Sequence, residues 1–372
     1  MVRPSCDADP SLKGRRSVGF PLLIVASWLL LLNTDAGQPP RIIQEQRQSD
    51  RRPSMKLRPT IRMQAGFTIL LWSLGLGTGA AAAEIEPVID ADRLEAIACE
   101  PDVVVLDIRS DKIDGQSRAE YEQGHVPCAI HSDYVKDGWR MKAKGVPGML
   151  PPVDKLEALI GSLGIDDETH VVIAPMGRDA KSVAAGTRVY WTLKLLGHDA
   201  VSILDGGTLG YFDKESRPLE ANARTPQPKS FTARLRPEML IEADAVAPAA
   251  ARGALVVDYR RRDEFNGLNR NGKTTRAGTL LGAHNLPLEW LTRDNGGFFR
   301  SAGALQQIYG FAGIPVDAQQ IAFCNTGHKA SLGWFIAHEI LGSTDVQLYD
   351  GSMAEWSRLE GRPMAQVIRV GD

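Results

Sequence analysis

The sequence predicts an α/β protein made of two successive domains, each a doubly wound parallel sheet flanked by helices. Three observations support this fold class. The chain has 372 residues, enough for two domains of ordinary size. From Glu84 onward one pattern of strands, loops and helical stretches runs through the chain twice. The strands of that pattern are near-continuous apolar runs, which is typical of parallel strands buried on both faces.

Five pairs of segments occur in the same order in the two halves. They are a β-branched run that ends in an acid (103–109 and 254–260), a Gly turn followed by Ala (124–130 and 278–284), an apolar strand before a polar loop (170–182 and 320–331), a helical stretch that ends at Gly (189–197 and 334–342), and a short strand before an acid–glycine turn (201–207 and 346–352). The glycines that close the helical stretches suit the C′ position of a helix.

The pairing defines the expected domain boundaries. We expect a first domain over 84–220, a Pro-containing linker over 221–236 and a second domain over 237–372. A repeat of this length indicates a duplicated domain and not a solenoid unit.

Composition excludes some classes of function. The net charge of −2 gives no electrostatic reason to expect nucleic acid or an anionic membrane as a partner. The proportions of apolar and charged residues are those of a soluble globular protein, and the chain contains no cofactor signature.

The N-terminal region has the layout of a secretory signal that begins at Met55. A basic start precedes an apolar centre at 66–76 and an Ala-rich end, so residues 55–83 are interpreted as a signal peptide cleaved after Ala83. This predicts a periplasmic or secreted protein. A second apolar run at 18–32 lies upstream. We interpret residues 1–54 as a non-native extension of the reading frame, and a membrane anchor at 18–32 is the less favoured alternative.

Cysteine use singles out one residue. Without the leader, Cys99, Cys128 and Cys324 remain, and an odd number cannot be paired completely within the chain. In an oxidising compartment an unpaired thiol is at risk of oxidation, so its presence needs a functional explanation.

Cys324 lies at the predicted carboxyl end of a strand, where doubly wound sheets bind ligands. The turn that follows has backbone N–H groups that can form an anion-binding nest, and the next helix adds its positive end. His328 and Lys329 add side-chain donors. All of these features favour a thiolate.

Other roles for Cys324 fit less well. A core cysteine would be flanked by apolar residues on both sides, a disulfide has no partner nearby in the sequence, and a zinc site lacks a second Cys or His at ligand spacing. A phosphatase-type loop would need Arg where the chain has Ala330.

The order Asp-x-Arg, Gly-x-x-x-x-Ala, Cys-x-x-Gly-x-x-Ala and Asp-Gly-Gly/Ser resembles the tandem-domain rhodaneses, the thiosulfate and 3-mercaptopyruvate sulfurtransferases. The resemblance covers nearly all of 88–366 and implies two tandem rhodanese-like domains. In this family only the second domain carries the nucleophile. The counterpart of Cys324 in the first half is Pro175.

The resemblance implies that the protein is a sulfurtransferase and that Cys324 accepts a sulfur atom. Cys324 would take the outer sulfur of a small anionic donor as a persulfide and pass it to cyanide or a thiol, with ping-pong kinetics. The backbone amides of the loop, from Asn325 through Thr326, Gly327 and His328 to Ala330, would hold the persulfide, and Lys329 would hold the donor's sulfonate.

One position departs from the family pattern. Glu264 stands where these enzymes place an anion-binding Arg, and Arg262 and Arg276 are the candidates to replace that charge. Asp258 and Arg260 are expected to form a structural ion pair at the strand end. His328 and Lys329 bring positive charge and favour thiosulfate over 3-mercaptopyruvate as the donor.

Two rival functions remain open. Glu264 in an anion pocket motivates a persulfide carrier that receives sulfur from a protein partner. A redox protein that pairs Cys324 with Cys99 or Cys128 is the third hypothesis.

Overall fold

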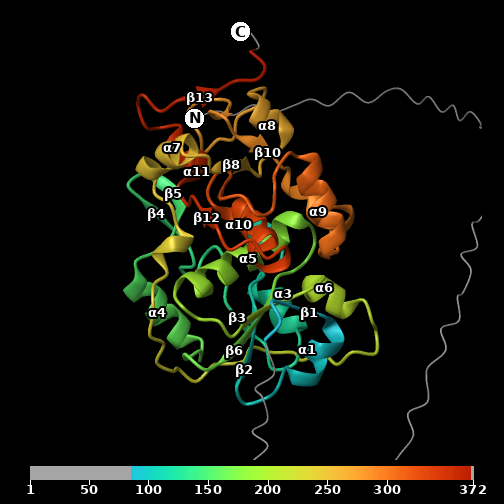
Figure 1. Cartoon of the computed structure of the whole chain (residues 1–372). Helices are drawn as coiled ribbons and strands as arrows, with labels where there is room; N and C mark the ends of the chain where they lie inside the picture. Colours follow the sequence, from blue (N-terminus) through green and yellow to red (C-terminus); the bar gives the residue numbers. More distant parts are fainter. Residues whose placement is uncertain (1–84, 370–372) are drawn as a thin grey trace, which may run out of the picture. The chain divides into compact units, whose positions relative to one another are not determined.

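The computed structural model describes residues 85–369 (Figure 1). The predicted signal peptide at 55–83, the extension at 1–54 and the alternative anchor at 18–32 therefore lie outside the described residues. Among the helices of 85–369, none has the length and apolar character needed to cross a membrane.

The first half forms a five-stranded, all-parallel sheet. Its strand order is β1-β7-β6-β2-β3. The strands are β1 (Val88–Ile89), β2 (Val103–Asp107), β3 (Ile130–His131), β6 (His170–Ala174) and β7 (Val201–Leu204). A separate antiparallel hairpin consists of β4 (Met141–Ala143) and β5 (Val146–Met149).

Helices cover both faces of this sheet. Residues of α1, α3 and α6 pack in one buried apolar cluster, and residues of α4 and α5 pack in another on the opposite face. The helices are α1 (Ala91–Ile97), α2 (Asp111–Asp114), α3 (Arg118–Gln123), α4 (Val153–Ser162), α5 (Ala180–Leu195) and α6 (Gly207–Phe212). The alternating strands thus bury both of their faces, which explains their continuous apolar character.

The second half repeats the arrangement. Its parallel strands run in the order β10-β8-β11-β12, and Leu240 bridges Leu348 on the outer side of β12. The strands are β8 (Leu255–Asp258), β10 (His284–Asn285), β11 (Gln320–Phe323) and β12 (Val346–Leu348), and a small antiparallel pair consists of β9 (Thr279–Leu280) and β13 (Met364–Ala365).

The helices of the second half again lie on two faces. Residues of α7 and α11 share one apolar cluster, whereas those of α9 and α10 belong to another. The helical segments are η1 (Pro237–Met239), α7 (Ala243–Ala251), α8 (Arg262–Asn266), η2 (Leu288–Trp290), η3 (Arg293–Asn295), α9 (Ala302–Phe311), α10 (His328–Phe335), the π-helical η4 (Ile336–Ile340) and α11 (Ser352–Trp356). The predicted fold, two doubly wound parallel sheets with flanking helices, is confirmed.

The matched glycines act as helix terminators. Gly197 and Gly342 adopt φ of 86° and 77°, one residue beyond the C-caps that follow α5 and η4. This left-handed conformation costs glycine little, because glycine has no Cβ. The sequence interpretation of both positions as C′ residues is confirmed.

Residues 221–236 contain no helix or strand, but they pack against the first half. Backbone amides of Lys229 and Arg234 donate to the carbonyls of Gly161 and Leu196. Close approach is possible because the partner surface contains glycine: a Cβ on Gly161 would lie 2.6 Å from the carbonyl oxygen of Lys229. The segment is therefore a fixed connection between the halves, and the exact domain boundaries stay a prediction.

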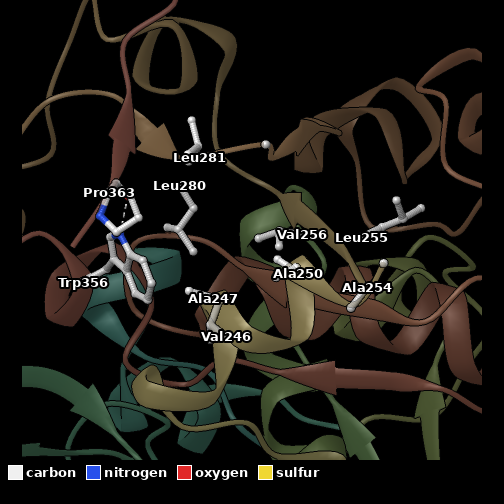
Figure 2. Close-up of a pocket in the computed structure, with 13 residues that line it drawn as sticks. Val246, Ala247, Ala250, Ala254, Leu255, Val256, Leu280, Leu281, Trp356 and Pro363 are labelled. Atoms are coloured by element: carbon white, nitrogen blue, oxygen red, sulfur yellow. Dashed lines mark hydrogen bonds between the residues drawn. The ribbon is translucent and has the colours of Figure 1, made fainter.

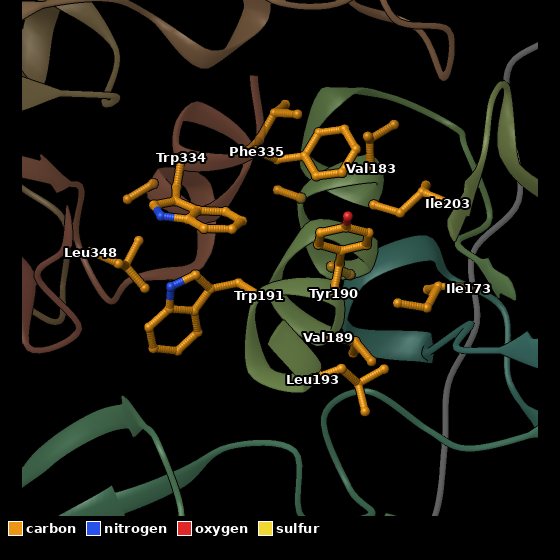
Figure 3. Close-up of a cluster of buried hydrophobic side chains, with 14 of the residues drawn as sticks. Ile173, Val183, Val189, Tyr190, Trp191, Leu193, Ile203, Trp334, Phe335 and Leu348 are labelled. Atoms are coloured by element: carbon orange, nitrogen blue, oxygen red, sulfur yellow. The ribbon is translucent and has the colours of Figure 1, made fainter. Parts of the chain in front are cut away.

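The two halves share one apolar core between α5 and α10 (Figure 3). Tyr190 of α5 meets Phe335 of α10 edge to face, with ring centroids 4.8 Å apart. Trp191 and Trp334 are fully buried beside them. Such aromatic pairs add about 0.5–1.5 kcal/mol beyond the area that they bury. The catalytic loop expected at the start of α10 is thus carried by the element that joins the halves.

Cys99 and Cys128 form a disulfide in the first half, with their Cα atoms 5.3 Å apart. Cys324 is a free, buried cysteine. The hypothesis of a redox protein that pairs Cys324 with Cys99 or Cys128 is therefore wrong for this structure, because its partner thiols are used by one another.

Candidate active site around Cys324

Cys324 follows the last residue of β11 and lies three residues before the N-cap of α10. Its counterpart Pro175 follows β6 in the same way. The Cys324 side chain is only 1% exposed and belongs to the shared apolar core. The burial is more complete than expected for a nucleophile at an open loop.

The loop turns through Gly327, whose φ of 66° sets up the start of α10. No side chain caps this helix, so the N–H groups of its first turn, which include those of His328 and Lys329, have no acceptor within it. In the described part of the chain no protein acceptor takes the N–H groups of Asn325 or Thr326 either. These amides match the expected nest.

The amide of Gly327 departs from that expectation. Both Cys324 and Gly327 donate their N–H groups to Ser352 Oγ, each at 3.1 Å. Ser352 is fully buried at the start of α11, and its hydroxyl donates a hydrogen bond to the carbonyl of Tyr349. Ser352 therefore fixes the loop from behind, and the Gly327 amide stabilises the loop, not an anion.

The first half supports the loop through two arginines. Arg140 donates to the carbonyl of Thr326 at 2.5 Å, and Arg188 of α5 donates to the carbonyl of Gly327 at 3.2 Å. Arg188 also lies 2.6 Å from Asp350 Oδ1 as a close ion pair without hydrogen-bond geometry, and both side chains are buried. These contacts hold the carbonyls of Thr326 and Gly327 from the side of the first half.

His328 connects the halves as a neutral ring. Its Nε2–H donates to the carbonyl of Lys181 at 3.0 Å, so Nδ1 accepts from the Tyr134 hydroxyl at 2.8 Å. Burial holds the pKa of His328 well below its usual value, and the cation of Arg140 acts in the same direction. The expectation that His328 brings positive charge is wrong, because a fully buried imidazole loses its proton.

Positive charge at the site comes from lysines instead. Lys329, at the start of α10, is only loosely held, with Nζ 3.7 Å from Glu289 Oε1. Burial lowers the pKa of Lys273, and Arg140 lowers it further, whereas the Cys324 sulfur acts in the opposite direction. Lys273 therefore lies within electrostatic range of the sulfur, a role that its place in a Gly-rich loop did not reveal.

Glu264 lies beside the loop and does not turn away. Its side chain is 8% exposed, and Oε1 accepts a hydrogen bond of 2.9 Å from Asn325 Nδ2. The residue directly after the nucleophile thus contacts a carboxylate, although a family-typical arginine would place a cation there.

The two replacement arginines do not take over that position. Arg276 donates four hydrogen bonds to the carbonyls of Trp356, Ser357, Leu359 and Arg362, so its guanidinium serves the fold. Arg262 is exposed and lies over the ring of Trp290, 5.6 Å from its centroid. Among residues 85–369, neither arginine forms a hydrogen bond or an ion pair with the Cys324 loop, so their assignment as anion ligands gains no support.

Asp258 and Arg260 form the predicted structural ion pair. Arg260 Nη2 lies 2.6 Å from Asp258 Oδ2, both side chains are buried, and Thr279 Oγ1 donates to the same oxygen. Asp107 and Arg109 repeat the pair in the first half. Because the pair occurs in both halves, it belongs to the fold and not to the chemistry of Cys324.

Two of the cavities on the second half differ in their position relative to Cys324. A polar cavity of about 460 Å³ borders the loop and is lined by Arg261, Asp263, Glu264, Asn269, Arg270, Asn271 and Lys329. An apolar cavity of about 430 Å³ lies between α7, β8, β9 and Trp356 (Figure 2). The apolar cavity opens near Gly253, at the amino end of β8, whereas Cys324 follows a carboxyl end. Of the two, the polar cavity is the one that borders the start of α10, through Lys329.

Sequence reasoning missed the residues that come from outside the loop. Arg140, Tyr134, Lys181 and Arg188 precede Cys324 by more than 130 positions and carry no motif of their own. A buried arginine within the apolar stretch of α5 was the one available signal. Within 85–369, no cluster of three or more metal-ligating side chains accompanies the site.

Comparisons with known proteins agree with this geometry. The model of the rhodanese-like domain matches residues 90–214 and 242–359. A putative thiosulfate sulfurtransferase of Haloferax volcanii is 31% identical over 249 residues, which cover 66% of this chain and 84% of that protein. The sulfur carrier protein TtuD of Thermus thermophilus is 28% identical and covers 76% of this chain, with 97% of its own length matched.

A solved structure gives the same result. SseA of Escherichia coli, described as a 3-mercaptopyruvate sulfotransferase with the rhodanese fold, superposes with a TM-score of 0.63 at 26% sequence identity. The match covers 72% of this chain and 98% of SseA.

Proposed function

This chain belongs to the rhodanese-like family and is a sulfurtransferase, and we propose that it moves a sulfane sulfur from thiosulfate to a thiol or to cyanide through a persulfide on Cys324. 3-Mercaptopyruvate is the alternative donor. The observation that carries the proposal is the position of Cys324: it is a free thiol at the carboxyl end of β11, followed by amides without protein acceptors.

In the first step the Cys324 thiolate attacks the outer sulfur of thiosulfate. The bond between the two sulfur atoms of the donor breaks, sulfite leaves with the electron pair, and Cys324 keeps the transferred sulfur as a persulfide. Lys329 and Lys273 supply the positive charge that attracts the dianion. The free N–H groups of the first turn of α10 donate to the terminal sulfur in this proposal.

In the second step an acceptor attacks the terminal sulfur. A thiolate or cyanide forms the new bond to that sulfur, and the Cys324 thiolate leaves and is regenerated. Arg140, Arg188 and Ser352 hold the loop in one conformation during both steps, because they bind its carbonyls and amides from behind. A loop that needs no rearrangement loses no activation energy to its own reorganisation.

The proposal is tested by mixing the purified protein with thiosulfate and cyanide and measuring thiocyanate. The wild type should release thiocyanate with ping-pong kinetics, and Cys324→Ser should release none above the uncatalysed rate. Cys128→Ala provides the matched control, because it removes a cysteine of the disulfide and leaves Cys324 intact. Full turnover by Cys324→Ser would refute the assignment.

A persulfide carrier is the second candidate, favoured by the contact between Glu264 and Asn325. A carboxylate beside the loop opposes a free dianion, so sulfur would come from a protein donor. A mass increase of one sulfur on Cys324 with a protein persulfide, but none with thiosulfate, would select this candidate.

We also propose that the protein is exported and works in the periplasm or outside the cell. The Cys99–Cys128 disulfide supports this proposal, because such bonds persist in oxidising compartments. Sequencing the N-terminus of the mature protein tests it: a start near Glu84 is expected, and a chain that retains residues 18–32 would contradict it.

A further inference from the structure

We propose that Glu264 selects the sulfur acceptor and that this acceptor is a small thiol carrying an ammonium group. The inference rests on the proposed persulfide of Cys324 and names the class of molecule that removes its terminal sulfur. It follows from one hydrogen bond, one unfilled buried acceptor, one carboxylate without an ion-pair partner and the charges around the polar cavity.

The hydrogen bond ties a carboxylate to the nucleophile's neighbour. Asn325 follows Cys324 directly, and its Nδ2 donates to Glu264 Oε1 at 2.9 Å. Both side chains are 8% exposed. The contact also fixes the amide orientation of Asn325, since the flipped amide would put an oxygen against the carboxylate.

Beside the loop, one buried acceptor is unfilled and one carboxylate has no ion-pair partner. Asn325 Oδ1 is buried and has no donor within the described protein. Glu264 receives one hydrogen bond from Asn325, and no ion pair within 4.0 Å involves it among residues 85–369. A buried acceptor such as Asn325 Oδ1 is costly unless a donor reaches it. An ammonium group has three N–H donors and a positive charge, so it matches both atoms.

The neighbouring carboxylate shows that the absence of a cation at Glu264 is particular to that residue. Asp263 lies beside Glu264, and Arg261 neutralises it with two hydrogen bonds of 3.0 and 2.5 Å. Arg261 is therefore occupied. Of the two acidic side chains that line the polar cavity, Glu264 is the one whose charge is left for a ligand.

The cavity offers both signs of charge. Glu264, Lys329 and Arg270 line it together. Lys329 is only loosely paired with Glu289, and Arg270 donates to the carbonyl of Thr274. The cavity volume of about 460 Å³ lies within the range of small-molecule sites. A sulfonate or carboxylate fits near Lys329 and an ammonium near Glu264. The dianionic donor is thus attracted by the lysine side of the cavity, and a cationic acceptor is attracted by the carboxylate on the other side.

The transfer step balances without a further reagent. The acceptor's thiolate attacks the terminal sulfur of the Cys324 persulfide, and a new sulfur–sulfur bond forms. The bond between that sulfur and Cys324 Sγ breaks, and Cys324 leaves as a thiolate. Glu264 takes no proton in this step: it attracts the ammonium group and so positions the thiolate.

The test separates loading from unloading. The full-length protein is first loaded with thiosulfate, freed of excess donor and checked by mass for one added sulfur. The loaded protein is then mixed with cysteamine or with 3-mercaptopropionate, which carry an ammonium and a carboxylate respectively, and the loss of the persulfide is timed. The ratio of the two rate constants is the readout, because the intrinsic reactivities of the thiols cancel when variants are compared.

Glu264→Gln should lower the ratio of cysteamine to 3-mercaptopropionate about tenfold relative to wild type, since close charge pairs couple by at least ~1.5 kcal/mol. Glu264→Asp keeps the charge and should retain most of the preference. Glu360→Gln removes the same charge from an exposed position outside the cavity and should keep the wild-type ratio. In the wild type, high salt should slow cysteamine more than 3-mercaptopropionate.

Each outcome decides a question. An equal ratio in wild type and Glu264→Gln overturns the acceptor assignment and leaves the persulfide untouched. A wild type that gains no sulfur from thiosulfate refutes thiosulfate as the donor, and the protein is then loaded with a protein persulfide for the same comparison. No added sulfur from either donor refutes the persulfide itself, and both proposals with it. If Glu264→Gln does not take up sulfur, the acceptor assignment is tested by the rate ratio of Glu264→Asp and by the salt dependence of the wild-type ratio. A wild-type ratio that does not change with salt counts against the inference.

Discussion

The hydroxyl of Tyr134, in the first half, donates a hydrogen bond of 2.8 Å to Nδ1 of His328, which opens the helix after Cys324 in the second half. Both side chains are buried. The half without a nucleophile thus takes part in building the loop of the half that has one. Variants at these contacts and at the charges around the sulfur should show how much the first half supports the Cys324 loop.

Arg188→Met should destabilise the protein by about 3–5 kcal/mol, because it leaves Asp350 buried without its cation. It also removes the donor to the Gly327 carbonyl, so the rate of persulfide formation should fall. Chemical denaturation and single-turnover loading measure the two effects. Arg118→Met is the matched control: its ion pair with Glu122 is exposed, and about 0.5 kcal/mol or less is expected. Equal effects of the two variants would contradict a supporting role of Arg188.

Gly327→Ala should impair the loop more than backbone strain alone explains. The left-handed φ of 66° costs an alanine about 1–2 kcal/mol. In addition, its Cβ would lie 2.5 Å from Arg188 Nη1 and 2.7 Å from Asp350 Oδ1. Gly342→Ala shares the positive φ but meets open space, so it isolates the cost of the backbone. Thermal unfolding and activity of the pair should show a larger loss for Gly327→Ala, and an equal loss would mean that the loop is free to move.

Protonation of His328 should weaken the fold below pH 6.5. The native state keeps His328 neutral because burial lowers its pKa well below the usual 6.5, whereas the unfolded chain binds a proton near that value. The unfolded state then holds more protons, so the free energy of unfolding decreases as the pH falls. His328→Gln should remove up to about 1.4 kcal/mol per pH unit of this slope. His170 and His198 also have pKa values lowered by burial, and they cancel in the comparison. Identical pH profiles for the two proteins would show that His328 is not kept neutral.

Lys329→Gln should raise KM for thiosulfate more than it lowers kcat, since a charge that holds the donor acts on binding in both the ground and transition states. Initial rates over a range of thiosulfate concentrations measure the split. Lys112→Gln removes a lysine whose side chain is 69% exposed in the first half and should leave both constants unchanged. An unaltered KM in Lys329→Gln would make this lysine a bystander and shift the role to Lys273.

The parts of the fold that the sequence predicts are those that repeat. Strand runs such as 103–107 and 255–258 are apolar because both faces are covered, and glycines such as Gly197 close helices by the same backbone conformation in each half. Cys324 stands out because its strand ends and a polar turn begins. Local patterns of this kind are visible without knowledge of contacts over long distances.

The parts that the sequence does not predict depend on such contacts. His328 looks like a cation by its type, yet burial between Tyr134 and Lys181 makes it neutral. Arg276 looks like an anion ligand, yet four carbonyls already use its guanidinium. The type of a residue gives its usual charge. Neighbours that lie far along the chain determine whether it keeps that charge and whether it is free to bind a ligand.

The most direct measurement of the central claim is the mass of the peptide that contains Cys324 after incubation with thiosulfate and removal of excess donor. The account predicts an increase of one sulfur atom on Cys324, reversed by a thiol reductant and absent from Cys324→Ser. An unmodified Cys324 in a preparation that turns over thiosulfate at full rate would contradict the account.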